Sequence, residues 1–339
     1  MRYKLLGRSG LRVSELCLGT MTFGETWGWG ASKTESRKIF DAFVAAGGNF
    51  IDTANNYTDG VSEQYVGEFV ATERDRFVVA TKYTLSPRKG DPNAGGNQRK
   101  NMVQSLEASL KRLNTDYVDI YWLHMWDAMT PVEEVLRGLD DLVRSGKVLY
   151  VGISDTPAWV IAKANTIAEL RGWSRFEAVQ IEYNLLLRGA ERELLPMARD
   201  FGLAVLAFGL LEGGELTGKY NRPTPDPKRH DQASARGKAL AAEIMKIAGE
   251  IGRSPSQVAI NWVRQQRNNL IIPIIGARTE AQIKDNLGCL DFELTDEQLQ
   301  QLADANPLDP GYPNYFLAQP HLVDLIYSGM FDQIDNHHA

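Results

Sequence analysis

Short runs of apolar, often β-branched residues alternate along this chain with longer segments in which apolar residues recur every three or four positions. The short runs predict buried strands, and the longer spacing predicts helices with one apolar face. Such an alternation is typical of repeated strand–helix–strand units around a parallel sheet. We predict strands at residues 16–19, 49–51, 76–81, 117–123, 148–153, 178–181, 204–208 and 270–275. We predict helices at residues 33–46, 99–113, 131–145, 157–172, 190–201 and 235–266.

Eight strands, each followed by a helix, favour an α/β fold of the (β/α)8 TIM barrel type, with a doubly wound sheet as the alternative. The 339 residues contain no linker and no internal repeat, so we expect a single domain, residues 1–339. Loops 86–98 and 221–234 are long and rich in proline or glycine, which is typical of functional loops. Prolines and aromatic residues in 305–339 indicate a C-terminal substrate loop or tail that covers the barrel mouth.

The charge balance narrows the set of partners. With 37 basic and 43 acidic residues and no long basic run, nucleic acid and anionic membranes are poor candidates. The two cysteines are far apart and lack metal-ligand spacing, as do the acids and histidines, so we predict no metal site. We expect a cytoplasmic protein, a monomer or homo-oligomer, that acts on a small molecule.

Five predicted strands end at a polar residue that is costly to bury: Asp52, Lys82, His124, Ser154 and Gln180. In a barrel, the carboxyl ends of the strands meet at one mouth, so these side chains would converge there. Each one also has a structural interpretation, as a helix cap, a hydrogen-bonded core residue or one half of a buried ion pair. Their joint occurrence favours an active site.

Two common nucleotide-binding motifs are missing or incomplete in the sequence. No G-x-G-x-x-G follows a predicted strand, which argues against a doubly wound dinucleotide site. Residues 213–219 match a P-loop, but Tyr220 stands where the magnesium ion needs a hydroxyl from Ser or Thr. ATP hydrolysis is therefore excluded as the function.

Several stretches in the same order resemble the aldo-keto reductases, especially the bacterial branch that is similar to potassium-channel β-subunits. The matching stretches are LGRSGLRVS (6–14), LGTMTFG (18–24), GNFIDTANNY (48–57), GVSE (60–63), LKRLNTDYVD (110–119) and IGAR (275–278). The resemblance covers about residues 3–300 and implies a (β/α)8 barrel closed at its bottom by an N-terminal hairpin, here 3–5 and 12–14.

The resemblance also implies an NADPH-dependent oxidoreductase that reduces aldehyde or ketone carbonyls to alcohols. Its catalytic tetrad would fall on Asp52, Tyr57, Lys82 and His124. Tyrosine needs help to donate a proton at neutral pH, because its ordinary pKa is near 10. We expect Lys82 to stabilise the phenolate of Tyr57, Asp52 to hold Lys82, and His124 to hydrogen-bond the substrate oxygen.

The cofactor implied by the resemblance is NADP(H). Ser154, Asp155 and Gln180 would hold the carboxamide of the nicotinamide, although Asp155 replaces the usual asparagine. Phe208 would stack on the nicotinamide ring in place of the usual tyrosine. Arg278 and Gln282 would hold the 2′-phosphate, so we expect NADPH to be preferred over NADH. The full implied set is Thr20, Met21, Ser154, Asp155, Gln180, Phe208, Gly209, Leu211, Gly213, Lys219, Gly276, Arg278, Gln282 and Asn286.

Trp27, Trp29 and Trp126 could line an aromatic substrate pocket, or they could only pack loops onto the barrel. Two rival functions also stay open. One is an NADP(H)-binding regulatory or redox-sensing subunit with slow turnover. The other is a cofactor-free lyase or hydrolase that uses Lys82 as a Schiff-base amine.

Overall fold

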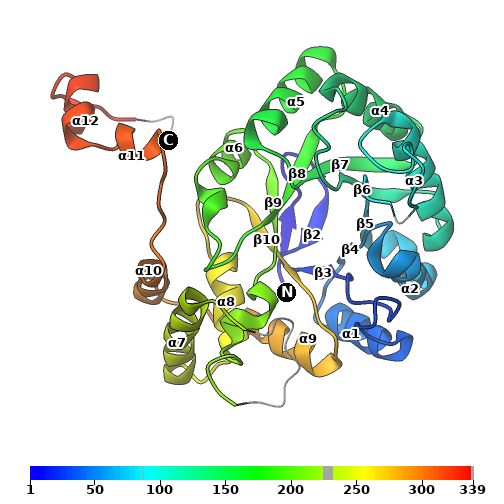
Figure 1. Ribbon diagram of the computed structural model, residues 1–339, viewed down its shortest axis with the longest axis horizontal. Coiled ribbons are helices and arrows are strands. Elements are labelled where there is room, and N and C mark those ends of the chain that lie inside the picture. The colour runs from blue at the N-terminus through cyan, green and yellow to red at the C-terminus, as the bar shows by residue number, and fades with distance from the viewer. Residues whose placement is uncertain (87, 224–231, 337–339) are drawn as a thin grey trace.

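Eight parallel strands close into a barrel in chain order, because the last strand pairs with the first. The structure is a computed structural model that describes residues 1–86, 88–223 and 232–336. Figure 1 shows the strands in the centre and the helices around them. The predicted TIM barrel is thus confirmed and the doubly wound sheet is excluded. The strands are β3 (Cys17–Gly19), β4 (Phe50–Asp52), β5 (Val78–Tyr83), β6 (Val118–Leu123), β7 (Val148–Ser154), β8 (Phe176–Glu182), β9 (Ala204–Phe208) and β10 (Ile271–Ile275).

Two apolar clusters explain why these strands are continuously hydrophobic. Side chains that point inward fill the barrel, and those that point outward pack under the helices. In β6, Ile120 and Trp122 belong to the inner cluster, while Tyr121 and Leu123 belong to the outer one. Strands of a parallel barrel are buried on both faces, so their sequences lack the polar alternation of a half-exposed strand.

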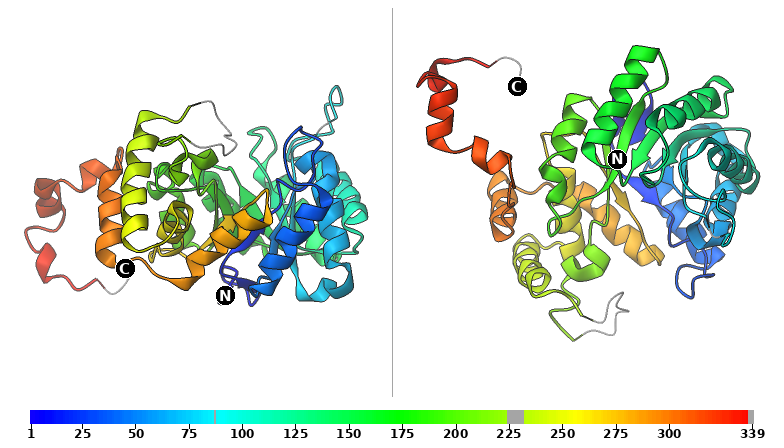
Figure 2. Two further views of the ribbon diagram at one scale, coloured as in Figure 1. Left: turned by 90° about the horizontal axis from the view of Figure 1, so that it is seen from below. Right: turned by 45° about the horizontal axis from the view of Figure 1, so that its top comes forward.

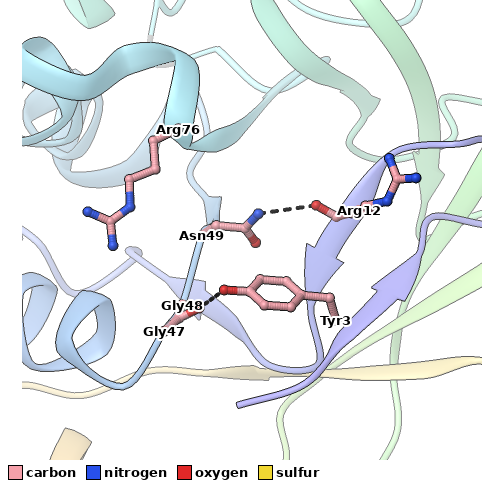
Figure 3. A pocket seen from close by; sticks show the side chains of 6 residues that line it. All are labelled: Tyr3, Arg12, Gly47, Gly48, Asn49 and Arg76. Carbon is pink, nitrogen blue, oxygen red and sulfur yellow. Dashed lines mark hydrogen bonds between the residues drawn. The ribbon is translucent and has the colours of Figure 1, made fainter.

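An antiparallel hairpin of β1 (Tyr3–Leu5) and β2 (Arg12–Ser14) closes the barrel at its bottom, as the resemblance implied. Leu6 and Val13 from the hairpin are fully buried in the inner cluster. Beside the hairpin lies a cavity of about 290 Å³ (Figure 3). Its lining residues are Tyr3, Arg12, Gly47, Gly48, Asn49 and Arg76.

Four of the six predicted helical segments correspond to single helices. They are α1 (Lys33–Ala45), α2 (Val61–Val70), α3 (Arg99–Leu113), α4 (Val132–Arg144), α5 (Ala158–Arg171), α6 (Leu194–Asp200), α7 (Ala235–Glu250), α8 (Pro255–Arg264), α9 (Glu280–Leu287), α10 (Asp296–Ala305), α11 (Asn314–Leu317) and α12 (Pro320–Ile326). Among the described residues, no helix is long and apolar enough to cross a membrane.

One predicted helix is wrong in its length. The segment 235–266 is two helices, because Gly252 takes a left-handed φ of 65° and Ser254 then begins α8 with a capping box before Pro255. The segment 190–201 likewise begins with a 3-10 turn, Gly189–Glu191, and becomes α-helical only in α6. Helices α2, α9, α10, α11 and α12 lie outside the predicted helical ranges. Most of loop 221–234 lies outside the described residues.

The expected cover of the mouth by residues 305–339 is also wrong for the part that the structure describes. Figures 1 and 2 show α11 and α12 standing beside the barrel, connected to α10 by an extended segment. Tyr312, Tyr315 and Phe316 are exposed and pack on one another instead of on the strand ends. Aromatic composition alone indicated an apolar surface in this segment, but not its direction.

Gly152 in β7 is expected to be essential for barrel packing. A Cβ atom at this position would lie 2.2 Å from a ring carbon of the buried Trp122. Gly152→Ala should therefore lower the free energy of unfolding by about 1–3 kcal/mol, as overpacking of a core does. Gly249→Ala in α7 is the control, since no atom lies within 4 Å of its added Cβ. Urea unfolding of both variants measures the difference, and equal stability would contradict this packing argument.

Candidate active site

A buried ion pair lies at the centre of the strand ends. Lys82, in β5, and Asp52, at the end of β4, approach to 2.5 Å between Nζ and Oδ2. The ammonium also donates to the carbonyl of Thr53 at 2.8 Å, and Gln180 donates to the other carboxylate oxygen at 3.1 Å. Burial disfavours the charge of Lys82, but Asp52 and Tyr57 outweigh it and raise its pKa above the ordinary value. The lysine is therefore a cation at neutral pH.

Tyr57 lies directly against this cation. Its Oη accepts a hydrogen bond of 3.1 Å from Lys82 Nζ, which also stands 4.7 Å from the centre of its ring. Burial raises the pKa of Tyr57 and outweighs the opposing effect of Lys82. Lys82 lowers the pKa of Tyr57, as expected, but burial raises it by more. The phenol is therefore protonated at neutral pH.

The loop after Tyr57 has an unusual backbone. Thr58 and Asp59 take left-handed φ angles of 46° and 58°, and Gly60 follows at 90°. A β-branched residue in this region is strained, and such strain persists only where the surroundings enforce it. Here the Thr58 hydroxyl donates to the carbonyl of Phe23 at 2.6 Å and accepts from the backbone N–H of Ser62 at 3.1 Å.

A second ion pair, between buried Glu63 in α2 and partly exposed Arg112, fixes the same loop. Glu63 is fully buried and accepts from the Thr81 hydroxyl and from Arg112 Nε, both at 2.5 Å. Thr81 precedes Lys82 in β5, so Glu63 connects the loop of Tyr57 to the strand of Lys82. In the sequence, Glu63 and Arg112 stand out only as parts of the stretches that carry the family resemblance. Their pairing could not be read from the chain, since they are 49 positions apart.

His124 follows β6 on the other side of Tyr57. The two rings have centroids 6.0 Å apart and meet edge to face. Burial, with a smaller contribution from Lys82, lowers the pKa of His124 to about 3, so the imidazole is neutral. Its Nδ1 is buried and has no hydrogen-bond partner among the described residues. The structure thus brings together all four residues of the implied tetrad.

The ends of β7 and β8 carry the residues expected at the carboxamide. Ser154 is buried, and its Oγ has no partner within the part of the chain that the structure describes. Asp155 is exposed and takes a left-handed φ of 40°. Gln180 is buried and uses its Nε2 on Asp52. It therefore supports the ion pair directly, which the sequence did not indicate.

The loop after β9 combines glycines with acids. Phe208, at the end of β9, is half-buried, and Gly209, Gly213 and Gly214 take left-handed φ angles of 73°, 57° and 95°. Lys219 lies close under Gly214, where a Cβ would meet its Nζ at 2.4 Å. Leu211 is half-buried beside these glycines.

Two carboxylates near this loop were not predicted. Burial raises the pKa of Glu182, and Glu212 and Asp155 raise it further by repulsion. Glu212 accepts from the side chain of Asn184 at 2.9 Å. Among the described residues, no group of three or more His, Cys, Asp or Glu side chains has the arrangement of a metal site.

The start of α9 carries the last expected contacts. Gln282 accepts from the backbone N–H of Arg278 at 2.8 Å, and buried Asn286 donates to the carbonyl of Gly276 at 3.1 Å. No hydrogen bond or ion pair engages the guanidinium of Arg278 in the described ranges. Gln282 and Asn286 thus shape the turn, and Arg278 is the cation that this turn presents.

The remaining residues expected at the site lie in two places: after β3 and in the outer apolar cluster under α4 and α5. Thr20 is buried and donates to the backbone carbonyl of Asp52 at 3.0 Å, and Met21 beside it is half-buried. Trp27 and Trp29, in the loop after β3, pack on each other with ring centroids 5.7 Å apart. Trp126 instead packs against the outer apolar cluster under α4 and α5, so it does not join them.

Comparison with known proteins agrees with this geometry. The model of the aldo/keto reductase family matches residues 15–307. The chain belongs to the aldo/keto reductase family. Family membership supports an oxidoreductase that acts on small-molecule carbonyls with a nicotinamide cofactor.

Named relatives cover nearly the whole chain. Norsolorinic acid reductase stcV of Emericella nidulans is 39% identical over 92% of this chain and 83% of its own length. Norsolorinic acid reductase B of Dothistroma septosporum is 38% identical, with 94% and 85% covered. The aryl-alcohol dehydrogenase [NADP(+)] of Phanerodontia chrysosporium is 38% identical, with 96% and 91% covered. The resemblance recognised in the sequence is thereby confirmed.

The neutral state of His124 predicts a pH dependence of stability. As pH falls from 6.5 toward about 3, the unfolded chain protonates this imidazole and the folded protein does not. The unfolding free energy should therefore fall by about 1.4 kcal/mol per pH unit in this window from this residue alone. Urea unfolding between pH 7 and pH 5 should show a shallower decline for His124→Asn than for wild type. The control is the same substitution at the exposed His321. A slope unchanged by His124→Asn would show that the imidazole of His124 is not held neutral.

Proposed function

We propose that the protein reduces aldehyde or ketone carbonyls to alcohols with NADPH, and that Tyr57 is the proton donor. The observation that carries the proposal is the phenol of Tyr57 at 3.1 Å from a buried, ionised Lys82. A carbonyl that accepts a hydride becomes an alkoxide and needs a proton at once. A protonated phenol beside a fixed cation meets that need, because the cation stabilises the phenolate left behind.

The other two residues have complementary roles in the proposal. Asp52 keeps Lys82 charged and oriented, and it is held in turn by Gln180. Neutral His124 can donate one hydrogen bond to the substrate oxygen and so orient the carbonyl toward Tyr57. In the direction of alcohol oxidation, the phenolate of Tyr57 would take the proton back.

Unsatisfied groups at the mouth fit a nicotinamide dinucleotide. The buried Oγ of Ser154 has no partner in the described residues, which is typical of a group that a ligand satisfies. The left-handed glycines after β9 allow close approach of a pyrophosphate, and Arg278 at the start of α9 can bind a 2′-phosphate. When bound, the reduced cofactor supplies the hydride.

The Schiff-base alternative is disfavoured by the charge of Lys82. An amine attacks a carbonyl only when it is unprotonated, and burial near other cations is the usual means of achieving this. Here Asp52 raises the pKa of Lys82 instead. The lysine therefore acts as a cation in the proposed mechanism.

The substrate class that we propose is aryl or other ring-bearing carbonyls. Trp27 and Trp29 present half-buried aromatic faces on the loop after β3. A relative that matches 96% of this chain is named as an aryl-alcohol dehydrogenase. Aromatic walls favour planar aromatic ligands through stacking.

Removal of one oxygen atom tests the proton donor. Tyr57→Phe should lower kcat for reduction of a benzaldehyde by at least about 100-fold, the usual contribution of a general acid, with NADPH affinity nearly unchanged. Tyr65→Phe is the control, because it makes the same change on α2. Full turnover in Tyr57→Phe would refute the proton-donor role. Tight NADPH binding without turnover in the wild type would favour the regulatory subunit.

A second variant tests the cofactor. Arg278→Met should raise the dissociation constant for NADPH about 10- to 100-fold and leave that for NADH unchanged, since a charged hydrogen bond contributes about 1.5–3 kcal/mol. Titration of intrinsic fluorescence with each cofactor provides the constants. Arg12→Met, on the bottom hairpin, should change neither constant. Equal weakening of NADH would place Arg278 away from the 2′-phosphate.

A further inference from the structure

Asn97 joins the two loops that follow the strands of Lys82 and His124. It is fully buried near the end of the loop after β5. Its Nδ2 donates to Thr84 Oγ1 and to the carbonyl of Met125, both at 2.9 Å. Thr84 comes two residues after Lys82, and Met125 directly follows His124. One side chain therefore links the segments that carry two of the tetrad residues.

The link is reciprocal. The backbone N–H of Asn97 donates to Asp127 Oδ2 at 2.7 Å, and the backbone N–H of Asp127 donates to Asn97 Oδ1 at 2.8 Å. Asp127 also accepts from the backbone N–H groups of Met129 and Thr130, which fixes the next part of the loop after β6. Both donor hydrogens and the oxygen of the Asn97 amide are thus in use. An aspartate of the same size has no such donors when it is ionised.

The backbone of the loop after β5 is strained where Asn97 holds it. Thr84 takes a left-handed φ of 97°, which is costly for a β-branched residue. Its carbonyl accepts from the backbone N–H of Gly96 at 2.8 Å. A Cβ atom on Gly96 would lie 3.1 Å from Asp127 Oδ2, so the two loops approach closely. Strain of this kind persists only where contacts enforce it, and it is concentrated at functional sites.

Two further hydrogen bonds extend this link to the neighbouring loops of the mouth. Asn55, in the loop after β4, donates from its Nδ2 to the carbonyl of Leu85 at 2.9 Å. On the other side, the backbone N–H of Trp126 donates to the carbonyl of Asp155 at 3.3 Å. The loops after β4, β5, β6 and β7 are therefore hydrogen-bonded in succession, and Asn97 lies in the middle of the series.

His124 depends on its backbone for its orientation. Its Nδ1 is buried without a partner, and no hydrogen bond engages its imidazole in the part of the chain that the structure describes. Its ring meets only the edge of Tyr57, at 6.0 Å between centroids. A group that donates one hydrogen bond to a reacting oxygen must be held within about 0.5 Å of its productive position. The contact that Asn97 makes at Met125 is well placed to supply this precision.

We propose that Asn97 is a positioning residue for the reaction: by holding the backbone at Met125, it sets the direction from which His124 meets the substrate oxygen. The inference rests on the proposed function, in which His124 orients a carbonyl. Asn97 acts through this histidine, since its own hydrogen bonds go to Thr84, Met125 and Asp127.

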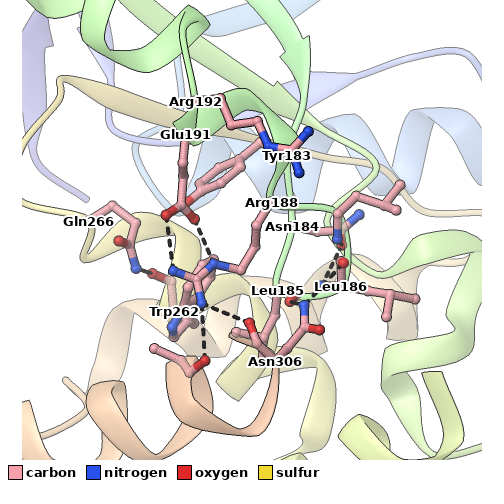
Figure 4. A network of polar contacts seen from close by, with 12 residues as sticks. Tyr183, Asn184, Leu185, Leu186, Arg188, Glu191, Arg192, Trp262, Gln266 and Asn306 are labelled. Carbon is pink, nitrogen blue, oxygen red and sulfur yellow. Dashed lines mark hydrogen bonds and ion pairs between the residues drawn. The ribbon is translucent and has the colours of Figure 1, made fainter. Parts of the chain in front are cut away.

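A second buried asparagine provides a matched control, shown in Figure 4. Asn306, which follows α10, donates to the carbonyls of Leu185 and Leu186 at 2.6 and 3.1 Å and accepts from Arg236 Nε at 2.5 Å. Its side chain therefore makes three hydrogen bonds, as that of Asn97 does. These bonds set the direction in which the chain leaves α10, and none of them involves the loops after β4, β5, β6 or β7.

A double-mutant cycle tests whether Asn97 acts through His124. Asn97→Ala should lower kcat for reduction of a benzaldehyde about 10- to 100-fold, as small misplacements of a catalytic group do, with the dissociation constant for NADPH unchanged. In the His124→Asn background, the same change should lower kcat by less than about 2-fold, because the residue that it positions is already gone. Asn306→Ala should leave kcat unchanged in both backgrounds. Equal losses from Asn97→Ala in the two backgrounds would indicate a general structural effect and overturn the proposal.

Nitrogen NMR of His124 tests the position of its ring without any substrate. With isotopically labelled histidine and the signals assigned by His124→Asn, Asn97→Ala should move the imidazole signals and Asn306→Ala should not. Asp127→Asn removes an acceptor from the other side of the link at a half-buried position, so it should also move them. This milder variant serves if circular dichroism shows that Asn97→Ala does not fold.

The two measurements separate this inference from the proposed function. A wild type that reduces no carbonyl, with His124 signals that still respond to the variants, would contradict the proposed function and leave the positioning of the ring supported. Signals of His124 that stay unchanged in the folded variants would overturn the role of Asn97, whatever happens to turnover.

Discussion

One buried ion pair, Lys82 with Asp52, determines how the rest of the site can be built. Two charges removed from water cost several kcal/mol each unless their geometry and remaining hydrogen bonds are satisfied. Here Thr53, Tyr57 and Gln180 supply the remaining partners. The pair therefore requires β4, β5 and β8 to keep a fixed arrangement, which the closed barrel provides.

The same exclusion of water sets the protonation states around the pair. His124 is neutral because burial disfavours a charged imidazolium, and the nearby Lys82 adds a smaller repulsion. Tyr57 keeps its proton because burial penalises the phenolate more than Lys82 stabilises it. The site thus holds one permanent cation and two neutral rings, an arrangement suited to receiving negative charge that develops on a substrate oxygen.

Several residues of the active site could be predicted from the sequence, and the physical reason differs from one residue to the next. Asp52, Lys82 and His124 stand out because each ends a run that is buried on both faces, and the barrel then forces them together. Tyr57 could be predicted only through the family resemblance. Its position depends on three successive left-handed residues, which composition does not reveal. The roles of Gln180 and Glu63 depend on contacts between distant strands and helices.

The direction in which residues 307–336 leave the barrel could not be predicted either. Prolines and aromatics in residues 305–339 correctly indicated an apolar segment outside the barrel strands, but a cover over the mouth of its own chain was inferred from composition alone. The buried Asn306 network decides the outcome, and it involves residues from after β8 and from α10. Tertiary contacts of this kind override local pattern.

Titration of Tyr57 by carbon NMR tests the central claim most directly. With tyrosine labelled at Cζ and the signal assigned by Tyr57→Phe, its ionisation can be followed without any substrate. The account predicts a midpoint above the ordinary value of 10.0 in the wild type and a further rise in Lys82→Met, which loses the opposing cation. A wild-type midpoint below that value, or no rise in the variant, would contradict the proposed control of the proton donor by burial and Lys82.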